Sequence, residues 1–312
     1  MNSRILSIVA AAITCWLLSS QAGAHPASGI VVDAKGQVYF VYTGRGLMKI
    51  EPDGKLTCVH ANRGGHWLCL DPEGRFSRAH PRYFERVTPD GAKPAIIYAD
   101  GGAPIAVCRD GNLYYASGVG TGEESKPGGL TVTRMSPDGK LTQFTPQLTK
   151  KLAEVHDGVT GLAAGHDGSL YVACPGGVFK VGMDGAVTTI AYPLVIPDCD
   201  MDPADHNWSH RVPFVRGLDV DSQGNVYAPA TSCHRVVKIT PDGKVGVILK
   251  SERPWSPTAV ALHDGAVYVL EYTNANGGPN EDGGWRPRVR KLDRDGKLTT
   301  LVEVPSDDDR GR

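Results

Sequence analysis

The sequence has no excess of charge of either sign and no run of basic residues. Its 312 residues include 33 Lys and Arg against 34 Asp and Glu, which gives a formal net charge of −1. Neutralising phosphates requires a concentrated basic surface, so this balance argues against a nucleic-acid partner. Aromatic residues are scarce at 7%, whereas 38 Gly and 22 Pro are too many for a helical bundle. With 41% hydrophobic residues, the chain is still apolar enough to bury a core.

Long apolar runs are absent after the first 24 residues. Arg4 precedes an apolar stretch from Ile5 to Leu18, and the small residues Ala22-Gly23-Ala24 follow. This order is typical of a cleaved secretory signal, and the stretch is short for a membrane span. We therefore expect residues 1–24 to be removed. Residues 25–312 would then form one exported domain, periplasmic or extracellular, with no membrane span.

The spacings C-x-x-C and C-x-x-C-H are also absent. Structural zinc, thioredoxin-like redox chemistry and covalent haem all lack their usual pattern here. Six cysteines follow residue 24, and an exported protein can keep disulfides. Nucleophile elbows, phosphate-binding glycine loops and dinucleotide fingerprints are missing as well.

What the sequence does contain is one strand repeated six times, each copy starting at a glycine. Tyr occupies the fourth place in five of the copies, and successive copies start 37 to 57 residues apart. This range brackets the roughly 40–50 residues of a four-stranded propeller blade. The copies are Gly36–Tyr42, Gly74–His80, Gly111–Ser117, Gly168–Cys174, Gly224–Ala230 and Gly265–Glu271.

Each copy is flanked by further strand signals. A short apolar segment precedes it, as in Gly29-Ile-Val-Val-Asp33 and Gly217-Leu-Asp-Val-Asp221, and such a segment suits the crowded innermost strand of a blade. Two more strands follow, joined by Asp-Gly, a strong hairpin signal because Gly accepts a positive φ. These turns are Asp53-Gly54, Asp90-Gly91, Asp138-Gly139, Asp184-Gly185, Asp242-Gly243 and Asp295-Gly296.

These units predict an all-β fold, a six-bladed β-propeller of four-stranded antiparallel blades. Phrases such as Gly217-Leu-Asp-Val-Asp-Ser-Gln-Gly-Asn-Val-Tyr227 and Val237-Lys-Ile-Thr-Pro-Asp-Gly243 resemble the NHL-repeat and gluconolactonase (strictosidine-synthase-like) propellers over essentially the whole mature chain. The resemblance is specific for the fold, whereas such propellers serve as enzymes, binding modules and scaffolds. With six complete units, closure of the ring would depend on packing of the first blade against the sixth, unless residues 304–312 or 25–28 contribute a strand.

Strand order sorts the connections onto two faces. The turns between strands one and two and between strands three and four share one face, which we call the turn face. The long insertions 118–129, 145–158, 191–213, 251–256 and 273–287 all fall on the opposite face, which we call the loop face. Function usually lies on the elaborated face. Cys199 and Cys233 both fall in loops of that face, which makes them the best single candidate for a disulfide.

Histidine and tryptophan concentrate on the loop face, and unlike residues stand there at equivalent places of the repeat. Unlike residues in a symmetric fold are where an asymmetric ligand site is built, and exposed aromatic residues favour recognition. Trp255 is a further aromatic residue of these loops. The predicted ligand-binding residues are Tyr42, His66, His80, His156, Asp157, Trp208, Arg216, His234, Glu271 and Trp285.

Metal binding is weakly supported. The gluconolactonase resemblance implies a divalent cation at the tunnel mouth, with a Glu at the start of the first inner strand, but this chain has Ser28-Gly29 there. Carboxylate-rich residues 198–205 precede His206 and His210, and cleavage would leave His25 at the N-terminus, so these three His are the weak metal candidates. No cofactor is predicted, and a divalent metal at the tunnel mouth stays an alternative.

Two kinds of function remain open. The first is an exported propeller that binds a small molecule, a glycan or a protein partner on its loop face. The alternative is a hydrolase or lyase of the gluconolactonase/strictosidine-synthase-like superfamily with a non-standard central site. His beside a carboxylate can titrate near neutrality, as at His156-Asp157, so acid–base chemistry is compatible with the sequence.

Overall fold

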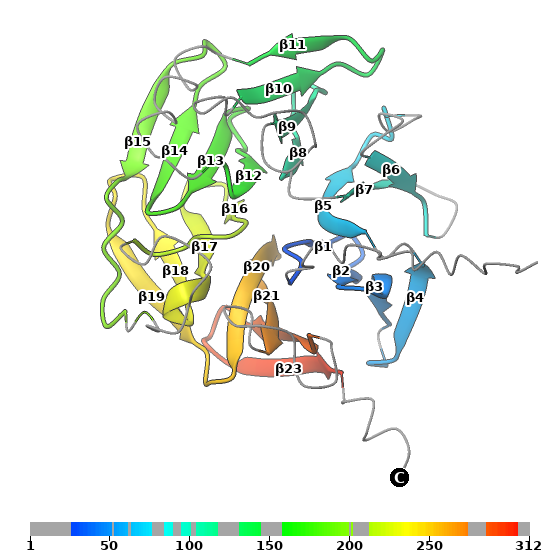
Figure 1. Cartoon of the computed structure of the whole chain (residues 1–312), viewed down its shortest axis with the longest axis vertical. Coiled ribbons are helices and arrows are strands. Elements are labelled where there is room, and N and C mark those ends of the chain that lie inside the picture. Colours follow the sequence, from blue (N-terminus) through cyan, green and yellow to red (C-terminus); the bar gives the residue numbers. More distant parts are fainter. Residues whose placement is uncertain are drawn as a thin grey trace, which may run out of the picture.

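The computed structural model describes most of the chain after residue 25. The described residues are 26–51, 53–61, 64–76, 84–89, 95–100, 104–117, 131–144, 158–199, 201, 212–273 and 285–304. Within them the chain is a six-bladed β-propeller of antiparallel sheets, as the repeat predicts (Figure 1).

The blades follow one another in chain order. Blade one contains β1 (Ile30–Val32), β2 (Val38–Tyr42), β3 (Gly46–Ile50) and β4 (Leu56–His60). Blade two contains β5 (Gly65–Asp71), β6 (Phe84–Val87) and β7 (Ala95–Asp100). Blade three contains β8 (Ile105–Val107), β9 (Leu113–Ser117), β10 (Thr131–Met135) and β11 (Leu141–Gln143).

The second half of the ring repeats the same plan. Blade four contains β12 (Gly161–Ala164), β13 (Leu170–Cys174), β14 (Gly177–Val181) and β15 (Val187–Ala191). Blade five contains β16 (Asp219–Val220), β17 (Val226–Ala230), the short 3-10 turn η1 (Thr231–Cys233), β18 (Arg235–Ile239) and β19 (Val245–Lys250). Blade six contains β20 (Trp255–His263), β21 (Ala266–Thr273), β22 (Pro287–Leu292) and β23 (Leu298–Glu303). The part of the chain described here has no helix long and apolar enough to cross a membrane.

Blade two departs from the predicted strand order. Residues 74–80 were expected beside the inner strand, but β7 takes that place, and the described sheet runs β5-β7-β6. Trp67 therefore pairs with Ala99, and Cys69 pairs with Ile97. The segment Gly74–His80 is the copy that lacks the repeated Tyr and carries Arg, Ser and His along its length, so it cannot supply the apolar face that the neighbour of an inner strand needs. Residues 77–83 lie outside the described part.

The repeated Tyr holds a regular place in the other five blades. It pairs across the sheet with the inner strand on one side and with a Lys or Arg on the other. Lys180, for example, lies 5.6 Å from the ring centre of Tyr171, and Lys238 lies 5.4 Å from that of Tyr227. Such cation–π contacts cover the aromatic face while the ammonium group stays in water.

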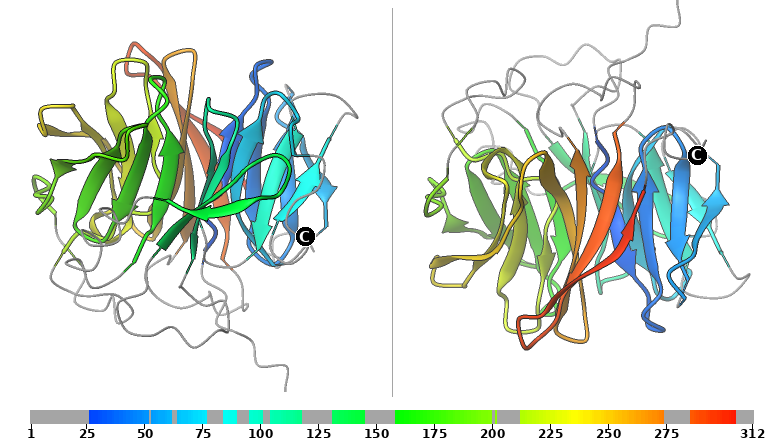
Figure 2. Two further views of the ribbon diagram at one scale, coloured as in Figure 1. Left: turned by 90° about the horizontal axis from the view of Figure 1, so that it is seen from above. Right: turned by 90° about the horizontal axis from the view of Figure 1, so that it is seen from below.

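The repeated glycines sit in turns that require a positive φ. Gly36 and Gly224, between the first and second strands of their blades, have φ of 77° and 80°. Gly243, in an Asp-Gly turn between outer strands, has φ of 82°. L-residues rarely adopt this region, which explains why glycine returns there blade after blade. These short turns lie together at one face of the ring, the turn face (Figure 2).

Six apolar clusters hold the ring together, one at each junction between neighbouring blades. The cluster that joins blade one to blade six includes Phe40, Ile50, Leu270 and Tyr272. The Tyr272 hydroxyl also donates to the Val41 carbonyl at 2.5 Å. Every described sheet is built from one contiguous stretch of chain, so within the described residues blades one and six meet by packing and share no strand.

Candidate functional site

The inner strands surround a central tunnel, and residues near their loop-face ends form a polar rim. We define the polar rim as Ser28, His66, Thr160, Arg216 and Thr258.

Hydrogen bonds draw the starts of these strands together. Ser28 N donates to His66 O at 3.0 Å, and Gly217 N donates to Thr160 O at 2.9 Å. The Thr258 hydroxyl donates to the Ala27 carbonyl at 2.8 Å. The rim therefore gathers side chains from five blades.

Arg216 gives the rim a buried positive charge. Its Nη2 donates to the Pro26 carbonyl at 2.7 Å, and its Cζ lies 5.9 Å from the ring centre of Phe214. Burial lowers the pKa of Arg216 to about 10, so the guanidinium keeps its charge at neutral pH. A buried cation is unfavourable unless other groups compensate its charge.

Trp67 crosses the tunnel just inside the rim. It starts from β5 in blade two, and its Cζ3 would lie 3.7 Å from a Cβ placed on Gly217 in blade five, on the opposite side of the ring. The side chain is buried, with 7% of its surface exposed. Its indole Nε1 is a donor, yet it has no hydrogen-bond partner among the described residues.

Two hydroxyl groups of the polar rim are also buried without a hydrogen-bond partner among the described residues. Ser28 Oγ and Thr160 Oγ1 are buried and make no hydrogen bond with any described group. Buried polar atoms are normally paired with protein or ordered water, because an unpaired one is costly. Together with the indole of Trp67, these atoms mark the rim as a place where a ligand or water completes the hydrogen bonding.

Beyond Trp67, the other ends of the inner strands line a second space, which we call the lower cavity. Its volume is 390 Å³, and all six blades contribute to its wall. The wall is apolar apart from Cys69, His166 and Asp219. The tunnel thus has a cationic, hydrogen-bonding end and an apolar end, with Trp67 between them.

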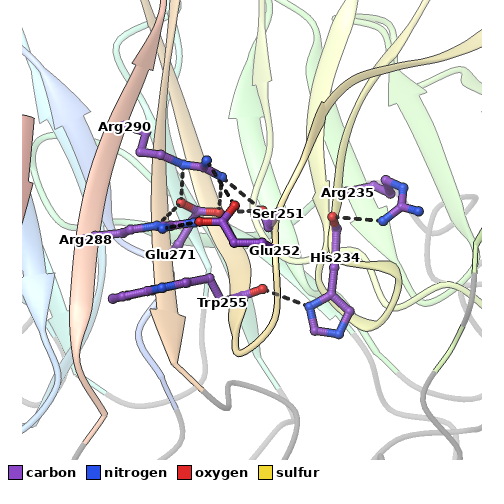
Figure 3. A network of polar contacts seen from close by, with 8 residues as sticks. All are labelled: His234, Arg235, Ser251, Glu252, Trp255, Glu271, Arg288 and Arg290. Atoms are coloured by element: carbon purple, nitrogen blue, oxygen red, sulfur yellow. Dashed lines mark hydrogen bonds and ion pairs between the residues drawn. The ribbon is translucent and has the colours of Figure 1, made fainter. Parts of the chain in front are cut away.

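Glu271 does not belong to the rim, although it was predicted to bind ligand. It lies in a closed network at the junction of blades five and six (Figure 3), and none of its side chain is exposed. Its carboxylate accepts hydrogen bonds at 2.6 Å from Arg288 Nε and from Arg290 Nη2, and also from the Ser251 hydroxyl. A ligand would have no surface of Glu271 to contact.

Glu252 extends the network at its outer edge. Its carboxylate accepts a hydrogen bond at 2.6 Å from Nη1 of Arg288, whose Cζ lies 4.3 Å from the ring centre of Trp255. Burial alone would lower the pKa of Arg288, but its bonds to Glu271 and Glu252 outweigh that effect and raise it. Trp255 therefore lies in β20 as a buried partner of this network, and its predicted role as an exposed loop residue is wrong.

His234 is buried beside the same junction. Its Nδ1 lies 2.8 Å from the Trp255 carbonyl oxygen and 2.9 Å from the Ser256 hydroxyl. Because a carbonyl only accepts, Nδ1 carries the proton in the neutral ring, and Nε2 is the acceptor. The backbone of His234 has φ of 52°, the left-handed conformation that ends η1.

The remaining predicted residues are dispersed. Tyr42 and Trp285 are partly buried and pack against the cluster that joins blades one and six. Trp285 Nε1 has no hydrogen-bond partner among the described residues. His80, His156, Asp157 and Trp208, as well as the weak metal candidates His25, His206 and His210, lie outside the described residues. The structure thus brings His66 and Arg216 to the tunnel and places His234 and Glu271 at the blade junction.

A disulfide joins Cys199 to Cys233, the pair that the face argument favours. It ties the segment after β15 to η1 in blade five. Arg235 reinforces the link, because its Nη2 donates to the Asp198 carbonyl at 3.0 Å. Within the described residues, no group of three or more His, Cys, Asp or Glu side chains could hold a metal ion.

Comparison of the sequence with known families and proteins gives no match. No protein-family model matches the chain, and no curated protein sequence matches it closely enough to count as a relative.

Solved structures, by contrast, share the fold over nearly the whole chain. Regucalcin from Agrobacterium tumefaciens, described as a calcium-binding protein, is 15% identical over 85% of this chain and 90% of its own, with a TM-score of 0.54. A candidate gluconolactonase is 18% identical over 90% of this chain and 91% of its own, with a TM-score of 0.55. A luciferin-regenerating enzyme is 15% identical over 91% of this chain and 95% of its own, with a TM-score of 0.53. At these identities the likeness shows the fold alone.

Proposed function

We propose that this propeller binds a small molecule bearing a carboxylate group at the loop-face end of its tunnel. The observation that carries the proposal is the indole Nε1 of Trp67, a buried donor without a partner among the described residues. The guanidinium of Arg216 lies at the same end of the tunnel, and charge-assisted bonds to carboxylate suit its geometry. None of the described rim residues is acidic. An acidic glycan or the carboxylate of a protein partner would satisfy the same donors.

The test measures binding of matched pairs of small molecules by calorimetry, such as benzoate against benzamide and galacturonate against galactose. We expect a carboxylate to bind, and Arg216→Met to weaken that binding at least about tenfold, the effect of a lost charge-assisted bond. Trp67→Phe keeps an aromatic ring but removes the Nε1 donor, so it should weaken binding by a smaller factor. Arg134→Met, at an exposed arginine of β10, is the control. Equal binding of charged and neutral partners by the unaltered protein would refute the proposal.

The second candidate is a hydrolase or lyase that acts at a non-standard central site. Two buried histidines support it. His66 belongs to the polar rim, and His234 holds its proton on Nδ1, which leaves Nε2 as the basic nitrogen in the neutral ring. A panel of lactones, esters and glycosides, run with metal analysis of the purified protein, tests this reading. Turnover that His66→Gln abolishes without changing the melting temperature would favour it, whereas binding without turnover across the panel would count against it.

Export to the periplasm or the medium is part of the proposal. The apolar stretch before Ala24 and the disulfide between Cys199 and Cys233 both support it, because disulfides persist in oxidising compartments. We also propose that the mature chain has no nucleic-acid partner and no membrane span. Mass spectrometry of the exported protein should find His25 as its first residue, and a retained N-terminal segment would contradict this.

A further inference from the structure

Asp219 is out of place in the repeat that lines the tunnel. The equivalent position of the inner strands pairs with the repeated Tyr in five blades, for example Ala163 with Tyr171 and Ala261 with Tyr268. Asp219 holds this position in blade five, paired with Tyr227. The six residues at this place are Val31, Cys69, Ala106, Ala163, Asp219 and Ala261. A charge that replaces small apolar residues at one of six equivalent places points to a specific use.

Asp219 contributes to the wall of the lower cavity, whose 390 Å³ lies in the usual range of small-molecule sites. Its side chain is partly exposed although it stands on an innermost strand, because the cavity itself supplies the accessible space. Protein surrounds this space on the sides, and most of its wall consists of Val, Leu, Ile and Ala. The site therefore combines apolar surface with one carboxyl group.

The carboxyl group has hydrogen bonds but no counter-charge. Its Oδ1 accepts from Val220 N at 2.8 Å, and its Oδ2 accepts from Leu262 N in blade six at 2.7 Å. No ion pair with a cationic side chain is found for Asp219 within the described residues. Each carboxylate oxygen retains a second lone pair. Burial raises the pKa of Asp219 to about 6, the mark of an acid whose charge the protein leaves uncompensated.

Two other ionisable groups lie near the turn-face mouth of the cavity. His166 lines the cavity, and its Nδ1 lies 3.2 Å from Nη2 of the exposed Arg109, which can only donate to it. Asp221 is already engaged by Asn225, whose Nδ2 donates to it at 2.8 Å. Neither group neutralises Asp219, and water screens the charge of Arg109.

We propose that the lower cavity binds a small apolar molecule that carries a protonated amine, with the Asp219 carboxylate as its counter-charge. A neutral apolar ligand would be served as well by Ala or Val at this place, as in the other blades, without a desolvated acid. An anionic ligand would be repelled. An ammonium group offers donors for the remaining lone pairs of the carboxylate, and the body of the ligand fills the apolar wall. This site is separate from the polar rim.

The experiment compares 2-phenylethylamine with 2-phenylethanol, which matches its shape without the charge. Calorimetry at neutral pH on the purified protein should show the amine binding at least about tenfold more tightly than the alcohol, the effect of a hydrogen bond to a charged group. Asp219→Asn keeps an acceptor for Leu262 N and should erase this preference. Ala164→Phe, at a partly exposed residue of the cavity wall, should abolish binding of both. Asp264→Asn is the control, since it removes an acid with an 87% exposed side chain from a turn of the same face.

Equal affinity for amine and alcohol, or an amine preference that survives in Asp219→Asn, would overturn the proposal. So would unchanged amine binding by folded Ala164→Phe, because the ligand would then sit elsewhere. If Asp219→Asn fails to fold, the amine preference of the unaltered protein together with its loss in Ala164→Phe still decides. Failure of both probes to bind the unaltered protein at about 1 mM also counts against it.

Discussion

Two carboxylates join blade five to blade six, and they have opposite surroundings. Glu271 accepts bonds from two arginines and a serine, and its side chain has no exposed surface (Figure 3). Asp219 accepts only backbone N–H groups and faces a cavity. A carboxylate enclosed by its counter-charges offers nothing to a ligand, and its removal would leave those charges buried and uncompensated. One without a counter-charge costs stability and keeps bonding capacity, which is the usual condition of a binding site.

The largest loss of stability should come from removing the charge of Glu271, the compensated carboxylate. Glu271→Gln keeps the shape of the side chain but leaves Arg288 and Arg290 without their main counter-charge. Removing one partner of a buried ion pair costs about 3–5 kcal/mol, which urea unfolding would detect. Glu252→Gln, which removes a side chain that is 61% exposed from the same network, is the matched control and should cost less than about 1 kcal/mol. Similar losses from both variants would show that the two carboxylates do not differ as described.

The uncompensated carboxylate predicts a pH dependence of stability. Burial raises the pKa of Asp219 from its ordinary 3.8 to about 6. An acid with a raised folded-state pKa contributes most below its unfolded pKa, and this contribution is lost as pH rises through the folded pKa. Losing this contribution lowers the free energy of unfolding by up to about 3 kcal/mol. Asp219→Asn, which stays neutral, should therefore gain in free energy of unfolding relative to the unaltered protein between about pH 4 and pH 7. A constant difference across that range would contradict the inferred environment.

The smallest change in stability should come from an acid whose side chain is exposed to solvent. Asp264 has an 87% exposed side chain and a left-handed φ of 47°, a conformation that Asn also tolerates. Asp264→Asn should change the free energy of unfolding by no more than about 0.5 kcal/mol at any pH in the same range. A larger change would mean that burial does not rank the effects of substituting Glu271, Asp219 and Asp264 as expected.

Much of the fold could be predicted because it depends on local rules that repeat. Gly36 and its counterparts need a positive φ, Tyr39 and its counterparts fill one place beside the inner strand, and these needs return in most blades. The order of connections was enough to bring Cys199 and Cys233 to one face. The strand order of blade two was predicted wrongly because Gly74–His80 keeps the glycine but lacks the Tyr. The missing Tyr was a visible sign in the sequence that this copy differs.

The site was less predictable because proximity to the tunnel does not say where a side chain points. Glu271 and Arg216 both stood at places where the repeat varies, yet only Arg216 reaches the rim, since two arginines on β22 enclose Glu271. Asp219 was overlooked because it lies inside the phrase that identified the repeat. Comparing it with Val31, Ala106 and Ala163 would have revealed it as the one acid among small apolar residues.

The closure of the ring has a consequence for how this chain could be rearranged. Each described blade is one contiguous stretch, and the junction between blades one and six has an apolar cluster of the same kind as the other five. Within the described residues no strand is shared between the first and the last blade, so this junction does not differ in kind from the other five. Joining the ends with a flexible linker and opening the chain between any two blades should give a circular permutant with the same ring.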